Sequence, residues 1–203
     1  MADSQDGIKI GKESLLNTKF SRKIIQIRLL FPGGSRDKSP SDSLIKKLIQ
    51  YYDLVVKWIS EFEKKVDRIN KIYFSLLMEE DKFDLFLKEN FGFAENFKLF
   101  IQDFVKNREL VIVENIDLLL EYIGWLEIIY GPDASEIDFK FYNDVLNERL
   151  NFISKKINED LRKNETGILF INSDNHMKFP EDIRVIYFRP PIVDDIIKDL
   201  IIK

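Results

Sequence analysis

The side chain with the broadest chemical capacity is the only histidine in the chain, His176. It lies in a polar loop directly after a predicted strand at residues 167–171. With an unperturbed pKa near ~6.5, a histidine can act as a general base or a metal ligand, and Asp174 is close enough in sequence to orient it. The alternative is a solvated loop histidine. The chain has no second histidine and no Gly-x-Ser-x-Gly turn, which favours this alternative.

Two other groups of polar residues follow predicted strands. Glu114 comes after the predicted strand at 109–113, so we expect it at the carboxyl edge of a sheet. The loop after the first predicted strand contains Ser35, Arg36 and Asp37. It lacks the glycine spacing and the Gly-Lys-Ser/Thr ending of a phosphate-binding loop and is most simply a turn. Open α/β sheets bind ligands at this edge, however, so these three residues are candidate ligand-binding residues.

The composition restricts the classes of function and location. The chain has no cysteine, which excludes disulfides, zinc thiolate sites and thiol catalysis and favours a cytoplasmic protein. The acidic runs at 79–81 and 194–195 lack the ligand spacing of a calcium loop, so no metal site is predicted. No sequence feature identifies a cofactor. The 31 basic and 35 acidic residues are mixed along the chain, which disfavours nucleic-acid binding.

Strands and helices alternate along most of the chain. Because parallel neighbours need helical crossovers, this order predicts a layered α/β fold with a mostly parallel sheet of about five strands and long amphipathic helices. The predicted strands are 23–31, 71–78, 109–113, 167–171 and 183–188, and the predicted helices are 44–69, 83–91, 95–107, 116–129, 138–162 and 192–202. Residues 1–22 are expected to form a loose lead-in to a single domain at 23–203. No apolar run reaches the ~20 residues that span a bilayer, so no membrane association is expected.

Two of these helices carry specific expectations. The helix at 116–129 is apolar nearly all round, so we expect neighbours to cover it on most sides. Arg149 lies inside the helix at 138–162, where an exposed arginine would need no explanation. If the helix at 116–129 stays exposed rather than covered, it would indicate a surface for a partner protein.

The last third of the chain resembles an uncharacterised prokaryotic family. The resemblance rests on Arg149 with the Ile-rich helix after it, Gly-Ile-Leu-Phe at 167–170, His176, and Phe-Pro-Glu-Asp-Ile-Arg-Val at 179–185. It extends more thinly over residues 24–190. The layout is also distantly similar to TraB/ChaN-type and erythromycin-esterase-type α/β domains, in which Glu114, Arg149 and His176 would match three functional positions.

The chain departs from that pattern at the end of its first strand. Where the related domains carry a His-Thr-Glu-like motif, this chain has Leu-Phe-Pro-Gly-Gly at 30–34. The resemblance therefore implies a regulatory or binding protein on a catalytically degenerate hydrolase-like scaffold, a pseudoenzyme. One alternative is a hydrolase that uses Glu114, Arg149 and His176, with Arg149 as an oxyanion or phosphate clamp. Another is a protein-protein interaction module. The sequence leaves three kinds of partner open: a protein partner, a second copy of the chain and a small-molecule ligand.

Overall fold

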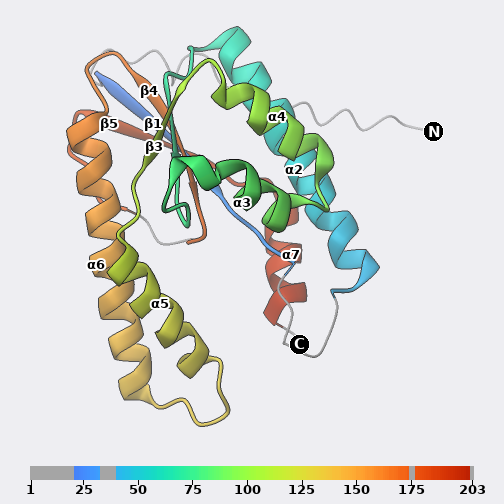
Figure 1. Ribbon diagram of the computed structural model, residues 1–203, viewed down its shortest axis with the longest axis vertical. Helices are drawn as coiled ribbons and strands as arrows, with labels where there is room; N and C mark the ends of the chain where they lie inside the picture. The colour runs from blue at the N-terminus through green and yellow to red at the C-terminus, as the bar shows by residue number, and fades with distance from the viewer. Residues whose placement is uncertain (1–20, 33–39, 174–176, 202–203) are drawn as a thin grey trace.

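The computed structural model describes residues 21–32, 40–173 and 177–201. These residues form a five-stranded sheet in which all neighbouring strands are parallel, in the order β3-β2-β4-β1-β5 (Figure 1). The strands are β1 (Arg22–Arg28), β2 (Lys71–Phe74), β3 (Glu109–Ile112), β4 (Thr166–Ile171) and β5 (Ile183–Phe188). The prediction of a layered α/β fold with a mostly parallel sheet of about five strands is confirmed.

Six α-helices and a short 3-10 helix connect or follow the strands in the described part of the chain. They are α2 (Asp42–Lys65), η1 (Glu80–Lys82), α3 (Phe83–Phe91), α4 (Glu95–Val105), α5 (Ile116–Ile129), α6 (Glu136–Asp160) and α7 (Ile192–Ile201). None of these helices is both long and apolar enough to cross a membrane.

Several element boundaries differ from the prediction, and three of these differences have a clear description. β1 begins at Arg22, inside the predicted lead-in, because the Arg22 side chain is fixed by Asp182 and by the carbonyl oxygen of Asn158. β2 ends at Phe74 because the chain turns at Leu76, whose φ is 71°. α2 ends at Lys65, before the last apolar positions of its predicted stripe.

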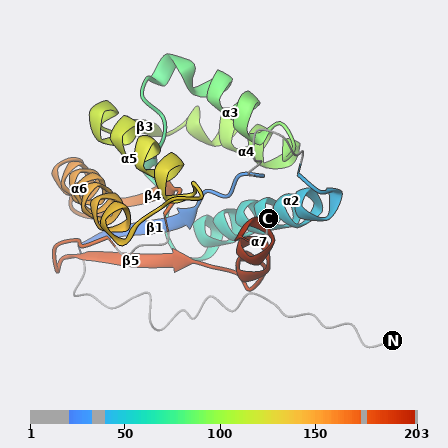
Figure 2. The same cartoon turned by 90° about the horizontal axis from the view of Figure 1, so that it is seen from below.

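The two faces of the sheet are covered by different helices. Ile25 and Ile27 of β1 pack in a cluster with α2, α3, α4 and α7, whereas Ile24 packs with α5 and α6. This division follows the period-2 alternation of a strand that is buried on both faces. Figure 2 shows α5 and α6 on one side of the molecule and α2 with α7 on the opposite side.

The crossover from β4 to β5 contains no helix in its described part. Met177 and Phe179 of this crossover pack into the same cluster as α5 and α6. β1, by contrast, leads to α2 on the other face. The chain therefore leaves two neighbouring strands, β1 and β4, toward opposite faces of the sheet.

Helix α2 fixes the carboxyl end of β1. Ser41 caps the helix by accepting a hydrogen bond from the Leu44 amide. Tyr51 donates its hydroxyl proton to the Arg28 carbonyl oxygen at 2.7 Å, and Tyr52 donates to the Leu30 carbonyl oxygen at 2.8 Å. Both tyrosines are fully buried, so these bonds hold the end of the strand against a rigid helix.

Helices α5 and α6 form an antiparallel hairpin whose connected ends extend beyond the rest of the molecule (Figure 1). Asn115 caps α5, and a capping box between Ser135 and Asp138 starts α6. Only Leu119 and Tyr122 of α5 are buried. The expectation that α5 is covered on most sides is wrong, because the hairpin projects past the sheet and no described element lies against its outer side.

Candidate functional site

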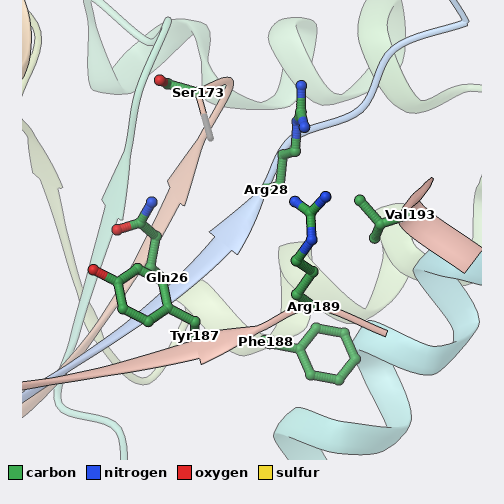
Figure 3. A pocket seen from close by; sticks show the side chains of 7 residues that line it. All are labelled: Gln26, Arg28, Ser173, Tyr187, Phe188, Arg189 and Val193. Atoms are coloured by element: carbon green, nitrogen blue, oxygen red, sulfur yellow. The ribbon is translucent and has the colours of Figure 1, made fainter. Parts of the chain in front are cut away.

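A pocket lies at the carboxyl edge of the sheet, where β1 and β5 end side by side. Its volume is about 270 Å³, and it lies beside the first turn of α7 and the end of β4. Figure 3 shows the Arg28 and Arg189 side chains extending in the same direction from the ends of their strands. The lining residues are Gln26, Arg28, Ser173, Tyr187, Phe188, Arg189 and Val193.

Strand alternation determines which β1 side chains reach this pocket. Ile25 and Ile27 belong to the core on the α2 side, so Gln26 and Arg28 belong to the opposite face. Gln26 pairs in register with Tyr187 of β5, which places both side chains at the pocket wall. Arg189 directly follows β5, at the same edge. Two neighbouring parallel strands therefore bring two arginines to one place.

Two arginines line the pocket, and one of them, Arg189, is already paired with a carboxylate. Burial lowers the pKa of the Arg28 guanidinium below its ordinary value, and the positive charge of Arg189 lowers it further. Arg189 also donates to the carboxylate of Asp194, in the first turn of α7, at 2.5 Å. Two like charges brought together in this way repel each other, so an anion placed between them would be favourable.

Gln26 presents a buried acceptor in the same pocket. The residue is 7% exposed, and its Oε1 atom is buried without a hydrogen-bond partner among the described residues. A buried carbonyl left without a donor costs roughly 1–3 kcal/mol. Such atoms are uncommon in native proteins, and a ligand that carries a donor group would satisfy this one.

Glu114 and Arg149 form a second polar cluster near this edge of the sheet. The Arg149 Nε donates to Glu114 Oε1 at 2.9 Å, and its Nη2 donates to Oε2 at 2.5 Å. Its Nη1 donates to Asn172 Oδ1 at 3.1 Å, and its guanidinium lies 4.9 Å from the centre of the Tyr122 ring. The Arg149 side chain is 1% exposed and that of Glu114 is fully buried. The alternative interpretation of Arg149 as an exposed arginine is therefore wrong, because α6 turns it toward Glu114.

The ion pair joins segments that are distant in sequence. Glu114 follows β3, Asn172 follows β4, and Glu114 Oε2 also accepts the Leu76 amide at 2.8 Å, just after β2. Leu76 has the left-handed φ of 71°, a conformation that is costly for leucine and needs support from its surroundings. The pair thus fixes the carboxyl ends of three strands.

This geometry limits what Glu114 and Arg149 can do chemically. Both carboxylate oxygens of Glu114 and all three nitrogens of the Arg149 guanidinium already have partners inside the protein. A general base or a phosphate clamp must reach a substrate, which here would require breaking a buried ion pair. The arrangement instead suits a positioning role for the neighbouring loops.

The structure brings together only two of the residues singled out from the sequence. Glu114 and Arg149 are in contact, whereas His176, Ser35, Arg36 and Asp37 lie outside the described residues. Within residues 21–32, 40–173 and 177–201, no group of three or more His, Asp and Glu is placed to hold a metal ion.

Sequence reasoning missed the residues of the pocket. The available signals were Gln26, a polar residue inside the apolar run at 24–27, and Arg189, which follows the last strand. Neither signal indicates that these residues meet, because β1 and β5 are separated by more than 150 positions and only the sheet order makes them neighbours.

Comparison of the chain with protein-family models, curated proteins and solved structures gave no match. The resemblance to TraB/ChaN-type and erythromycin-esterase-type domains therefore stays a prediction. The functional interpretation depends on the geometry of the pocket and of the Glu114–Arg149 pair.

Proposed function

We propose that this protein binds a small anionic ligand at the carboxyl edge of its sheet, as a binding or regulatory protein rather than a hydrolase. The observation that carries the proposal is the buried, unsatisfied Oε1 of Gln26 in a pocket that two arginines line. A pocket with a few convergent polar groups is the usual form of a small-molecule site.

The lining residues define the chemistry of the ligand. Arg28 and Arg189 suit a carboxylate or a phosphate group, which guanidinium groups bind through paired hydrogen bonds. The Gln26 oxygen requires a donor, such as a hydroxyl or an amine. Phe188 and Val193 add apolar wall. A volume of about 270 Å³ lies just below the usual range for ligand pockets, so a hydroxy acid or a small phosphorylated alcohol fits better than a dinucleotide.

The topology of the sheet supports this location. β1 leads to α2 on one face, and β4 leads to a crossover on the other face. Where neighbouring parallel strands diverge in this way, a crevice opens at their carboxyl ends, and open α/β sheets bind ligands there. The pocket lies beside this point, since the end of β1 and Ser173, which follows β4, both line it.

Binding can be measured with defined probes. Isothermal titration calorimetry should detect malate or glycerol 3-phosphate, each of which carries an anion and a hydroxyl, while neutral glycerol should not bind. Arg28→Gln, Arg189→Gln and Gln26→Met should each weaken binding by about tenfold or more, equivalent to about 1.4 kcal/mol. Arg68→Gln is the matched control, because Arg68 is an exposed arginine just before β2, at the amino edge of the sheet.

Two results would contradict the proposal. One is equal affinity of the pocket variants and the wild type for the anionic probes, or no binding of either probe. The other is turnover of a hydrolase substrate that both His176→Ala and Glu114→Gln abolish while each variant stays folded by circular dichroism. That second outcome would support the hydrolase alternative.

A further inference from the structure

The α5–α6 hairpin exposes most of the large apolar side chains on the described surface. Ile116, Leu120, Ile123 and Tyr130 are 52%, 59%, 42% and 82% exposed. Their spacing of four, three and seven residues places them along one side of α5 and its C-cap residue, Tyr130. Eight of the thirteen exposed large apolar side chains in the described residues belong to the hairpin: Ile116, Leu120, Ile123, Ile128, Tyr130, Ile137, Phe139 and Phe141.

Such a concentration is unusual for a surface that faces only water. Monomeric proteins rarely expose contiguous apolar patches larger than a few hundred Å², and larger ones mark interaction sites. Gly124 adds room for close approach, because a Cβ atom at this position would meet nothing within 4 Å. We call the side formed by Ile116, Leu120, Ile123 and Tyr130 the α5 stripe.

The same hairpin is strongly acidic. Residues 115–148 contain a single basic residue, Lys140, whereas the whole chain has a net charge of only −4. Residues 115–148 therefore carry more negative charge than the entire protein, and the remainder of the chain is net positive. The eight acidic residues of this segment are Asp117, Glu121, Glu127, Asp133, Glu136, Asp138, Asp144 and Glu148.

We infer that the hairpin docks a basic amphipathic helix of a partner protein on the α5 stripe. The apolar side chains would receive the apolar face of that helix, and the surrounding carboxylates would pair with its lysines and arginines. A second copy of the chain is a poorer occupant, since it would bring an equally acidic hairpin against the first and add like-charge repulsion.

The shape of the stripe favours a helix over an extended strand. Side chains at i, i+4 and i+7 form a ridge that packs into the groove of another helix. The 14 residues of α5 span roughly 21 Å, which a partner helix of about 14 residues would match. The resulting arrangement is a three-helix bundle. This inference is independent of the edge pocket.

Designed peptides test the inference directly. A helical peptide with leucine at i, i+3, i+4 and i+7 and lysine elsewhere should bind the full chain, and one with glutamate at the lysine positions should not. Leu120→Asn with Ile123→Asn should weaken binding of the lysine peptide by about tenfold or more. Leu85→Asn with Leu99→Asn is the matched control, because these leucines on α3 and α4 are 52% and 56% exposed.

Charge gives a second readout. Asp117→Asn with Glu121→Gln should weaken binding and reduce its dependence on salt, since exposed charges are screened beyond ~10 Å at about 0.1 M ionic strength. All substituted positions are exposed, so circular dichroism and thermal melts should show folded proteins. Three results would overturn the inference: absence of binding, equal binding of the acidic peptide, or a dimer in solution that the Leu120→Asn and Ile123→Asn substitutions dissociate.

Discussion

Replacing Gln26 with methionine should stabilise the ligand-free protein while it weakens ligand binding in the edge pocket. Methionine is unbranched and close to glutamine in length, so it can fill the same space against Tyr187. It removes the Oε1 atom, which is buried without a partner among the described residues. The substitution separates the energetic cost of the pocket from its binding function.

The size of the effect follows from the burial of this atom. An unsatisfied buried acceptor costs roughly 1–3 kcal/mol, so its removal should raise the free energy of unfolding by about 1–2 kcal/mol. In a chain of 203 residues each kcal/mol corresponds to about 2–4 °C in Tm. Sites that bind ligands commonly carry such a cost, because the groups that serve the ligand are left unsatisfied without it.

Urea unfolding followed by circular dichroism should measure the change in the free energy of unfolding caused by Gln26→Met. Calorimetry with malate or glycerol 3-phosphate should measure the loss of affinity. Gln50→Met is a suitable control, because Gln50 is exposed on α2 and should change stability by less than about 0.5 kcal/mol. A Gln26→Met variant less stable than wild type by more than about 1 kcal/mol would refute the reasoning, since Gln26 would then make a favourable bond in the ligand-free protein.

Four further predictions concern stability. Glu114→Gln should cost about 3–5 kcal/mol in urea unfolding because it leaves Arg149 charged and buried, and a change below about 1 kcal/mol would show that the pair is not buried. Gly124→Ala should add about 0.5–1 kcal/mol, since the new methyl meets open space in a helix. Gly167→Ala should cost about 1–3 kcal/mol, since its Cβ would lie 2.6 Å from the Tyr73 ring. Thermal melts in which both alanine variants raised the Tm, or both lowered it, would contradict these two predictions. Burial raises the folded-state pKa of three tyrosines above the ordinary ~10 of the unfolded chain. The free energy of unfolding should therefore keep its full value below that pH and fall above it by about 1.4 kcal/mol per pH unit for each tyrosine. These are Tyr51, Tyr52 and Tyr73. Tyrosinate absorbance should appear together with loss of circular dichroism, and tyrosinate formation in a protein that remains folded would contradict the prediction.

The fold class and most of the elements can be predicted from the amino-acid sequence alone. The apolar run in β1 and the long stripe of α2 each carry a local periodicity, because a strand buried on both faces or an amphipathic helix must repeat apolar residues with its own period. Alternation of strands and helices then favours a parallel sheet. The sequence also located Glu114 at the end of a strand, where the structure has it.

Which residues meet and which stay exposed depends instead on how the elements pack together. Periodicity shows that Gln26 lies on one face of β1, but not that Arg189 lies beside that face, because this depends on the order of the strands. It shows that α5 is apolar all round, but not that its outer side lacks a neighbour. Arg149 is buried because packing between elements sets the rotation of α6 and so turns this side chain toward Glu114 and Tyr122. No local sequence pattern contains that rotation.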